Sequence, residues 1–312
     1  MQSMRSLSRL VSGFSCGLRR GPRQKEHWHI IKRRIMQRII HYLRAINAEN
    51  MKEWRIEWKY KPDFIRQFLA PFVYLLPYFL YGVALLGGRF SEHLRSMTGV
   101  SDMIAYTFVG YLIMGFLNTA CWAMGWSLRK EQWYGTLDTI FAAPVPRWVY
   151  VAGMAAHSTC HQGLIMLLQA VVVTVFFAIV FKTTGIALML LIVALMIIGL
   201  YGLGVLIAGL TIGLKQWWVI SEALSTLMII VTPIAYPLSV LPIFLRKVSL
   251  LLPTTYGVMG VRHLLLGEYL DISMGTILLR LCLILIIWVS FGMAVFLAMD
   301  RYGRKKGFVS LY

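Results

Sequence analysis

Hydrophobic residues are arranged along this chain in long blocks, and polar residues gather in the short stretches between them. Six blocks, at residues 64–88, 103–126, 148–181, 186–214, 219–235 and 274–299, are 17 to 34 residues long. A membrane core of about 30 Å needs about 20 apolar residues of helix. The pattern predicts an all-α polytopic membrane protein with six transmembrane helices. The fifth block is barely long enough, and the third, at about 50 Å, is long enough to tilt or project.

The segment before the first block also shows helical spacing, with apolar residues on one side and basic residues on the other. The apolar positions are Trp28, Ile31, Ile35, Ile39, Tyr42 and Ile46, and the basic ones are Lys32, Arg33, Arg34, Arg38 and Arg44. Residues 51–64 follow as a second interfacial piece, with Trp54, Trp58 and Tyr60 at headgroup level. We therefore expect an N-terminal amphipathic helix ahead of the first span.

The composition agrees with a membrane protein, because 58% of the residues are hydrophobic and the mean hydropathy is +0.68. The net charge of +18 is uneven, since residues 1–50 hold 11 Lys and Arg against two acidic residues. In so apolar a chain, this basic segment indicates contact with an anionic membrane surface and not with nucleic acid. Residues 1–24 also fit an organellar transit peptide, and an over-long start is an equal alternative.

These patterns divide the chain into a basic segment at residues 1–50, a transmembrane domain at 51–300 and a basic tail at 301–312. Lys and Arg favour the cytoplasmic side of a membrane. Most of those outside the spans fall on one side if both termini and the loop at 129–147 are cytoplasmic. We expect a multi-pass protein of the plasma (inner) membrane with both termini inside.

The fourth block contains a series of glycines that allow another helix to approach closely. They are Gly199, Gly202, Gly204, Gly209 and Gly213. The approaching helix belongs either to the same bundle or to a second copy of the chain, and the sequence leaves both alternatives open.

The loop at residues 129–147 is the one polar stretch in the middle of the apolar blocks. Gly135 breaks the chain there, and Thr136 is suited to cap a short helix that Pro144 and Pro146 stop. We therefore expect a helix of about two turns between Thr136 and Pro144.

This short helix carries one apolar stripe, because Leu137, Ile140 and Phe141 recur at i, i+3 and i+4. So short a helix is unstable alone in water. We expect it to dock against another protein.

The same loop carries a resemblance to a known family. The matching residues are Glu131, Gly135, Thr136, Leu137, Asp138, Ala142 and Pro144. They resemble the E-x-x-x-G-T-L-[ED]-x-x-x-A-x-P stretch of ABC-2 type membrane subunits, the permease halves of ATP-driven exporters. Asp138 stands where that family more often has Glu. The resemblance implies that this stretch, with Ile140 and Phe141, is the coupling helix seated in a groove of the ATPase subunit, and that residues 51–64 form the connecting helix.

After the fifth block, four prolines prevent a continuous helix, so the chain must turn back. They are Pro233, Pro237, Pro242 and Pro253. Irregular backbone at membrane depth must be buried in protein or line a cavity. We expect a re-entrant helical segment near the outer face between helices 5 and 6, with an ordinary apolar loop as the alternative.

This segment also resembles the ABC-2 subunits, in which such patterns cap the exit side of the pathway. The matching residues are Pro233, Tyr236, Pro237, Leu241, Pro242, Pro253, Tyr256, Arg262, Leu265 and Gly267. The resemblance implies an outer gate. We assign to it Pro233, Tyr236, Pro237, Pro242, Pro253 and Tyr256.

Polar and aromatic side chains inside the apolar blocks are candidates for the transport pathway. They are Asn118, Glu222, Tyr74, Tyr78 and Tyr81. Glu222 and Arg280 lie near the ends of their blocks and could instead reach an interface. The tyrosine stripe either packs in the core or stacks against sugars.

The stretch HSTCH places His157, Cys160 and His161 at i, i+3 and i+4, a spacing that could bind a metal. The group lacks a fourth ligand, so packing or a pathway lining is the other interpretation. Together with Glu222 it would define an intramembrane metal-dependent enzyme, which is the alternative function. We expect no metal or cofactor bound directly by this chain.

No G-x-x-x-x-G-K-[ST] occurs in the chain, so it cannot bind ATP in the P-loop manner. The resemblance implies a non-catalytic membrane subunit that works as a homodimer with two copies of a separate ABC ATPase, which bind the ATP and Mg²⁺. The expected function is ATP-driven efflux of an amphipathic substrate, a drug, lipid or lipid-linked glycan.

Overall fold

The computed structural model describes residues 22–60, a few positions between 62 and 80, and residues 88–182, 185–213 and 217–306. The chain forms two compact units, Met1–Ala45 and Ile46–Tyr312. The first predicted span lies mostly outside the described residues. Tyr74, Tyr78 and Tyr81 lie outside them as well.

Helices account for the regular structure, and the described residues contain no β-strand, which confirms the all-α prediction. The longer helices are α2 (Pro22–Glu57), α5 (Met103–Trp133), α7 (Arg147–Phe177), α8 (Ile186–Gly213), α9 (Trp217–Val231) and α12 (Met274–Lys306). The shorter ones are α4 (Glu92–Thr98), α6 (Leu137–Ala142), the 3-10 turn η1 (Leu238–Val240), α10 (Ile243–Ser249) and α11 (Pro253–Leu266).

Four helices of the described part are long and apolar enough to cross a membrane. They are Met103–Glu131, Arg147–Phe177, Ile186–Thr211 and Met274–Gly303, and the chain is an integral membrane protein. The helix α9 has 15 residues and falls short of that length. It ends two residues before Pro233, whose ring and missing N–H do not fit a helix interior. The count of six spans stays a prediction.

Two boundaries differ from those expected. The third block was predicted to continue to residue 181, but α7 ends at Phe177 because Ala178 adopts a left-handed conformation with φ of 48°. The two pieces expected before the first span form one helix, α2, which continues to Glu57. Positions 47–53 contain no glycine or proline that would break the helix between the two pieces.

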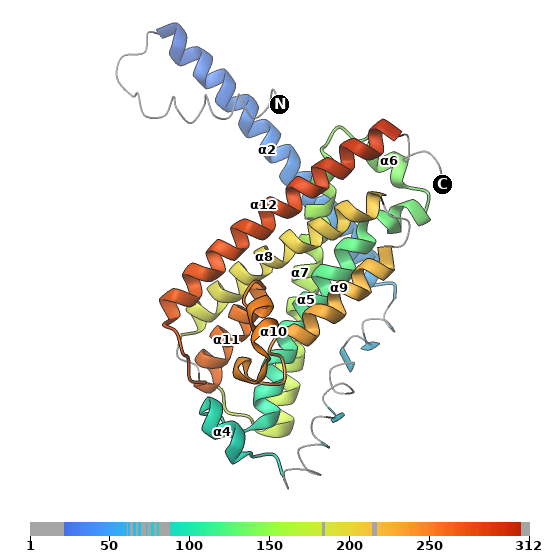
Figure 1. Cartoon of the computed structure of the whole chain (residues 1–312). Coiled ribbons are helices and arrows are strands. Elements are labelled where there is room, and N and C mark those ends of the chain that lie inside the picture. Colours follow the sequence, from blue (N-terminus) through green and yellow to red (C-terminus); the bar gives the residue numbers. More distant parts are fainter. Residues whose placement is uncertain are drawn as a thin grey trace. The chain divides into compact units, whose positions relative to one another are not determined.

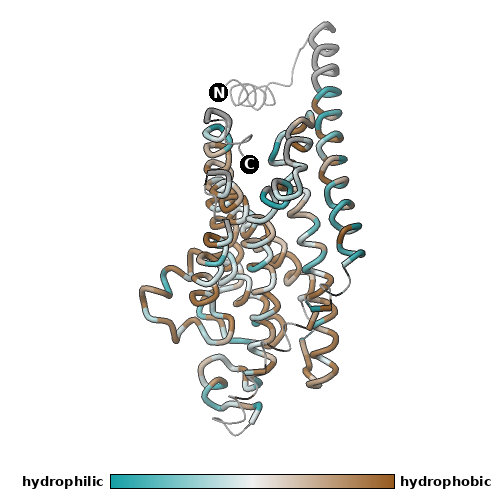
Figure 2. The backbone as a smooth tube through the Cα atoms, turned by 90° about the vertical axis from the view of Figure 1, so that its right-hand side faces the viewer, coloured by the Kyte–Doolittle hydropathy of each residue, from teal (hydrophilic) through white to brown (hydrophobic). Residues whose placement is uncertain are grey.

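Within the second unit, α8 lies at the centre, with α12 packed along one side and α5 along another. The helices α7 and α9 flank α5, and α11 packs against α5, α8 and α12. In Figure 1, α6 lies at one end of these long helices, and α4, α10 and α11 lie toward the other. Figure 2 shows that hydrophobic residues predominate along the helices of this unit. The main core is therefore formed by helices that are far apart in the sequence.

Two glycines allow the backbones of α8 and α12 to touch. A Cβ atom added at Gly202 would lie 2.5 Å from the backbone of Trp288 and Val289, and one added at Gly292 would lie 2.0 Å from the Gly202 carbonyl oxygen. At Gly209 the nearest atom would be the Phe296 Cα at 2.7 Å. At these described positions, the structure assigns the glycine series of the fourth block to packing inside one chain.

We expect Gly202→Ala to destabilise the protein by about 1–3 kcal/mol, because the new methyl group can fit only if α8 and α12 move apart. Gly163→Ala on α7 is the matched control, since nothing lies within 4 Å of its added Cβ. Alanine favours helix by about 1 kcal/mol relative to glycine, so the control should be neutral or more stable. Thermal unfolding in detergent measures both, and equal melting temperatures would contradict the close packing.

Candidate functional site

The predicted coupling loop leaves α5 at Trp133 and forms the six-residue helix α6 before α7 begins at Arg147. Gly135 has a φ of 69°, a left-handed conformation that glycine adopts without strain. At the other end, Ala143 is extended and Pro144 follows it. The backbone therefore turns where the sequence predicted a break and a stop.

Thr136 occupies the N-cap position of α6 but does not cap it, which corrects the expected hydrogen bond. Its φ and ψ of −97° and −3° are helical, whereas a capping side chain needs an extended residue. The Thr136 hydroxyl instead donates to the Glu131 carboxylate. The loop is thus closed on the last turns of α5.

Glu131 connects this loop to two other helices. One of its carboxylate oxygens, Oε1, accepts a hydrogen bond of 2.6 Å from Lys52 Nζ on α2 and lies 3.0 Å from the Tyr150 hydroxyl on α7. Its other oxygen accepts from Thr136. Glu131 is only 5% exposed, so these contacts are shielded from water. A single carboxylate therefore ties α2, α5, the coupling loop and α7 together.

A second set of ion pairs joins α2 to α5. Lys130 pairs with Glu53, and Lys52 lies 2.6 Å from Glu49 and 3.3 Å from Glu53. Glu53 and Lys130 are buried. We call Glu49, Lys52, Glu53, Lys130 and Glu131 the charged junction.

The charge of Lys52 is stabilised within this junction. Burial opposes it, but the hydrogen bonds that Lys52 donates to Glu131 and Glu49 outweigh burial and raise the pKa of Lys52 from 10.5 to about 12. A raised pKa means that the stabilisation is complete below pH 10.5 and is lost as the pH rises through about 12. Burial raises the pKa of Glu49, although Lys52 opposes this shift. The pairs of Lys52 therefore persist across the physiological pH range.

The helices α2 and α7 come close enough for these contacts because Gly153 has no side chain. A Cβ atom there would lie 2.6 Å from Glu49 Cβ and 3.2 Å from the Ile46 carbonyl oxygen. At the start of α7, Arg147 forms an ion pair of 2.5 Å with Asp300 on α12. The loop end of the second unit is thus held by buried or half-buried polar contacts.

Three carboxylates of the junction, those of Glu49, Glu53 and Glu131, have oxygens within 4.8 Å of one another. Such a group could hold a metal ion. Here, however, Lys52 and Lys130 already lie against these oxygens. Their ammonium groups balance the negative charge of the carboxylates, so we do not propose a metal site at this cluster.

Among the described side chains, the exposed ones of the coupling loop include Trp133, Tyr134, Thr139 and Ala142, of which Trp133 is 80% exposed. Ile140, which the sequence assigns to the ATPase contact, is partly buried against the chain's own core. That core includes Met124, Tyr150, Val151, Met154, Ala208 and Phe296. The side chains of Leu137, Asp138 and Phe141 lie outside the described residues, so their contacts stay a prediction.

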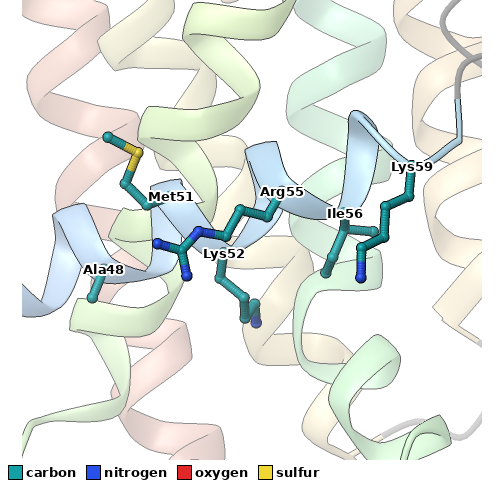
Figure 3. Close-up of a pocket in the computed structure, with 6 residues that line it drawn as sticks. All are labelled: Ala48, Met51, Lys52, Arg55, Ile56 and Lys59. Atoms are coloured by element: carbon teal, nitrogen blue, oxygen red, sulfur yellow. The ribbon is translucent and has the colours of Figure 1, made fainter.

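A shallow groove of about 340 Å³ runs along the end of α2. Figure 3 shows its side chains, and all six come from this helix and the turn after it. They are Ala48, Met51, Lys52, Arg55, Ile56 and Lys59. The mixture of apolar and basic groups is typical of a surface at the lipid headgroups.

The residues predicted to form an outer gate lie between α9 and the end of α11. Pro237 and Pro242 occupy the N-cap positions of η1 and α10, and Pro253 begins α11. The Tyr236 hydroxyl donates to the Ile230 carbonyl oxygen. Tyr256 is 2% exposed within the main core. The prolines therefore separate three short helical pieces, and Tyr256 anchors the last of them.

Arg262 on α11 holds this segment, and it is only 1% exposed. Its Nη1 donates to the Pro233 carbonyl oxygen at 2.7 Å, its Nη2 to that of Ile234, and its Nε to that of Tyr106 at 3.1 Å. The guanidinium also stacks on the Tyr106 ring at 3.6 Å from its centroid. One side chain thus satisfies carbonyl groups where the chain leaves the helical conformation after α9.

Glu268 completes this arrangement, which we call the arginine anchor, with Arg262, Tyr106, Pro233 and Ile234. The Tyr106 hydroxyl donates to Glu268 Oε1 at 2.7 Å, and burial raises the pKa of Glu268 despite the nearby Arg262. Sequence reasoning matched Arg262 to a pattern but did not identify its partners, and it missed Tyr106 and Glu268. The sequence did contain one signal for this pair. Arg262 and Glu268 are six residues apart, with an apolar stretch between them.

The other pathway candidates lie on different helices. Asn118 is half-buried on α5, next to Thr119, which bonds Gln162 on α7 at 3.2 Å. Glu222 is exposed on α9, where the Thr226 hydroxyl lies 3.5 Å from its carboxylate. The Thr119–Gln162 contact was not predicted, although both residues are polar positions in apolar blocks.

The structure does not assemble the set His157, Cys160, His161 and Glu222 that the alternative enzyme requires. The two histidines are buried, but Cys160 is exposed and Glu222 is exposed on another helix. Both histidines instead face Glu57, whose oxygens lie 3.2 Å from His157 Nε2 and 3.3 Å from His161 Nε2. His157, Cys160 and His161 are neighbours on one helix, but their side chains lie in different environments. Their sequence spacing did not distinguish the buried histidines from the exposed cysteine.

The family model described as ABC-2 type transporter matches residues 45–266, about 70% of the chain. The match covers α5 to α11, the coupling loop and the charged junction. No curated protein matches the sequence.

Proposed function

The chain belongs to the ABC-2 type transporter family, and from this premise we propose that it is the transmembrane subunit of an ATP-driven exporter. Members of the family are membrane subunits and are generally not catalytic. The observation that carries the proposal is the match over residues 45–266, because it includes both the coupling loop and the outer segment. Energy then comes from a separate ABC ATPase that binds the ATP and Mg²⁺.

The charged junction provides a route by which a partner on the loop side can act on the transmembrane helices. A force on α6 reaches Glu131 through Thr136 and from there reaches α2 through Lys52 and α7 through Tyr150. Closely packed helices move as units and do not deform continuously. Movement of the ATPase would therefore shift whole helices without any chemistry in this chain.

The coupling helix meets the ATPase, in this proposal, with the apolar residues Leu137 and Phe141 and the exposed aromatic side chains that precede the helix. Trp133 and Tyr134 are 80% and 67% exposed, which is typical of positions that a partner covers. Ile140 faces the core and holds the helix to the bundle. The proposed ATPase interface thus includes Trp133 and Tyr134 and leaves out Ile140, which the helical spacing had placed in the apolar stripe.

At the opposite end, η1, α10 and α11 form a re-entrant outer gate between spans 5 and 6. Their irregular backbone is compatible with membrane depth because the arginine anchor satisfies its carbonyl groups. With the first block and α9, the chain then has six spans, both termini in the cytoplasm and a place in the plasma membrane.

The working unit would be a homodimer with two ATPase subunits, in contact with membrane lipids through the groove of α2. The substrate class is amphipathic, a drug, lipid or lipid-linked glycan, because the half-buried polar groups Asn118, Thr119 and Gln162 stand among apolar side chains. The chain does not bind nucleic acid in this proposal.

The test is to purify the full chain from its source cells and identify what remains bound. We expect a P-loop ATPase to co-purify with it. Leu137→Ala combined with Phe141→Ala should preserve membrane insertion but dissociate the ATPase, because burying each side chain contributes about 1.5–3 kcal/mol.

Asp138→Asn on the same helix is the matched control, since it removes a charge and keeps the apolar residues. An exposed ion pair contributes about 0–1 kcal/mol, so we expect near wild-type binding. Retention of the ATPase by the double variant at the wild-type level would show that α6 is not the coupling element.

A further inference from the structure

Glu57 is the last residue of α2, and its environment differs from that of the other acidic residues on the same face. Glu49, Glu53 and Glu57 recur every four residues, so they share one side of the helix. Glu49 pairs with Lys52, and Glu53 pairs with Lys130. Among the described residues, the ion-pair partners found for Glu57 are His157 and His161. In the described part of the chain, this carboxylate therefore pairs with two imidazoles.

The two contacts are long for hydrogen bonds between charged groups. His157 Nε2 lies 3.2 Å from Glu57 Oε1, and His161 Nε2 lies 3.3 Å from Oε2. A charged N–H donor usually approaches a carboxylate to about 2.7–2.9 Å. Ligand atoms around tetrahedral zinc are separated by about 3.4 Å, given Zn–N and Zn–O bonds near 2.1 Å. The two separations observed here are closer to the second value, but they involve different carboxylate oxygens, and the three ligand atoms do not all lie within 4.8 Å of one another.

The surroundings favour a bound cation. His157 and His161 are 4% and 7% exposed, and their rings are nearly parallel, with centroids 6.0 Å apart. Trp54 packs against both rings in edge-to-face geometry, at centroid distances of 5.0 and 6.0 Å. Glu57 keeps 28% of its side-chain exposure, which leaves an entrance for an ion. The two imidazoles are thus covered by Trp54, and the carboxylate stays partly exposed.

We infer that Glu57, His157 and His161 form a binding site for a divalent transition-metal ion such as Zn²⁺. Two histidines at i and i+4 on one helix, together with a carboxylate, supply three ligands of the kinds that zinc prefers, and water takes the open position. Binding draws the two imidazoles together around one ion. It also joins the last turn of α2 to α7, next to the charged junction. This inference does not depend on the proposed transport function.

The test uses the full-length protein in detergent or nanodiscs, stripped of metal with a chelator and then titrated with Co²⁺. We expect one ion per chain, with the visible absorption of tetrahedral Co²⁺, and displacement by Zn²⁺. Glu57→Gln, His157→Ala and His161→Ala should each weaken binding by at least about tenfold, since even partners of metal ligands contribute that much. The variant with both histidines replaced should lose the spectrum.

Two control variants separate this site from other metal-binding side chains. Cys160→Ser and His93→Ala should bind as the wild type does, because Cys160 and His93 are exposed and outside the set. Zn²⁺ should also raise the melting temperature of the wild type and leave that of Glu57→Gln unchanged. If a histidine variant fails to fold, the near-isosteric variant Glu57→Gln still tests the inference.

Three results would overturn the inference. The first is the absence of stoichiometric binding to the wild type, which would leave Glu57 and the two imidazoles as a polar contact without a metal ion. The second is unchanged binding by the double histidine variant. The third is loss of binding in Cys160→Ser, which would show a different set of ligands.

Discussion

Replacing Arg262 with alanine is expected to lower the stability of the protein by at least about 3 kcal/mol. The substitution removes the donors to three buried carbonyl oxygens, those of Tyr106, Pro233 and Ile234. A buried acceptor left without a donor costs about 1–3 kcal/mol. Arg262→Lys keeps the charge, but a single ammonium group cannot donate to all three carbonyl oxygens as the planar guanidinium does. We therefore expect an intermediate loss of stability.

The surrounding packing gives little room for compensation. A Cβ atom added at Gly110 would lie 2.0 Å from the Ile234 carbonyl oxygen and 2.6 Å from Arg262 Nη2, so the site is closely filled. Thermal unfolding in detergent measures the stability. Arg280→Ala on α12 is the matched control, because Arg280 is also an arginine in an apolar block but is exposed. Equal melting temperatures for the two variants would contradict the arginine anchor.

The same substitution should also open the outer segment. Ser239 is exposed in η1 and can carry a reporter as Ser239→Cys in a chain that lacks the exposed Cys160. We expect Arg262→Ala to change the rate at which an impermeant thiol reagent labels this position in membranes. An unchanged rate would show that the arginine anchor does not control the conformation of η1.

Replacing Glu131 with glutamine is expected to weaken binding of the partner ATPase by at least about tenfold, which corresponds to about 1.4 kcal/mol. The substitution keeps the size of the side chain but removes the charge that Lys52, Thr136 and Tyr150 contact. A hydrogen bond to a charged group contributes about 1.5–3 kcal/mol. Without these bonds the coupling loop must be ordered during binding, which opposes association.

Affinity for the co-purified ATPase, together with ATP hydrolysis by the assembled complex in bilayers, measures this effect. Glu222→Gln is the control, since Glu222 is an exposed carboxylate in an apolar helix. Tyr150→Phe removes a single hydroxyl group and should have a smaller effect, because one ordinary hydrogen bond contributes about 0.5–1.5 kcal/mol. The junction would have no role in coupling if Glu131→Gln matched Glu222→Gln in both measurements.

Much of the fold could be predicted from the sequence because it depends on local rules. Apolar blocks of sufficient length predict membrane helices, and four of the predicted helices are present at nearly the expected positions. Gly135 and Pro144 flank the helix of the coupling loop because of their own backbone preferences. The α7 end at Phe177 was missed because a left-handed alanine has no sequence signal.

The functional contacts could not be predicted in the same way, because they join residues that are far apart in the sequence. Lys52 reaches Glu131 across 79 positions, and Arg262 reaches Tyr106 across 156. Such pairs depend on which faces of two helices meet, and helical spacing leaves that choice open. The sequence thus supplied the charged residues of the junction without their partners.

The coupling helix and the histidines show which features the sequence determines and which depend on the tertiary structure. Spacing determined that Leu137, Ile140 and Phe141 share a stripe, but packing turned Ile140 toward the core. Spacing likewise placed His157, Cys160 and His161 near one another, whereas the approach of α2 selected the two histidines for Glu57 and left Cys160 exposed. Periodicity determines which residues lie close together on one helix, and only the neighbouring helix decides which of them become buried.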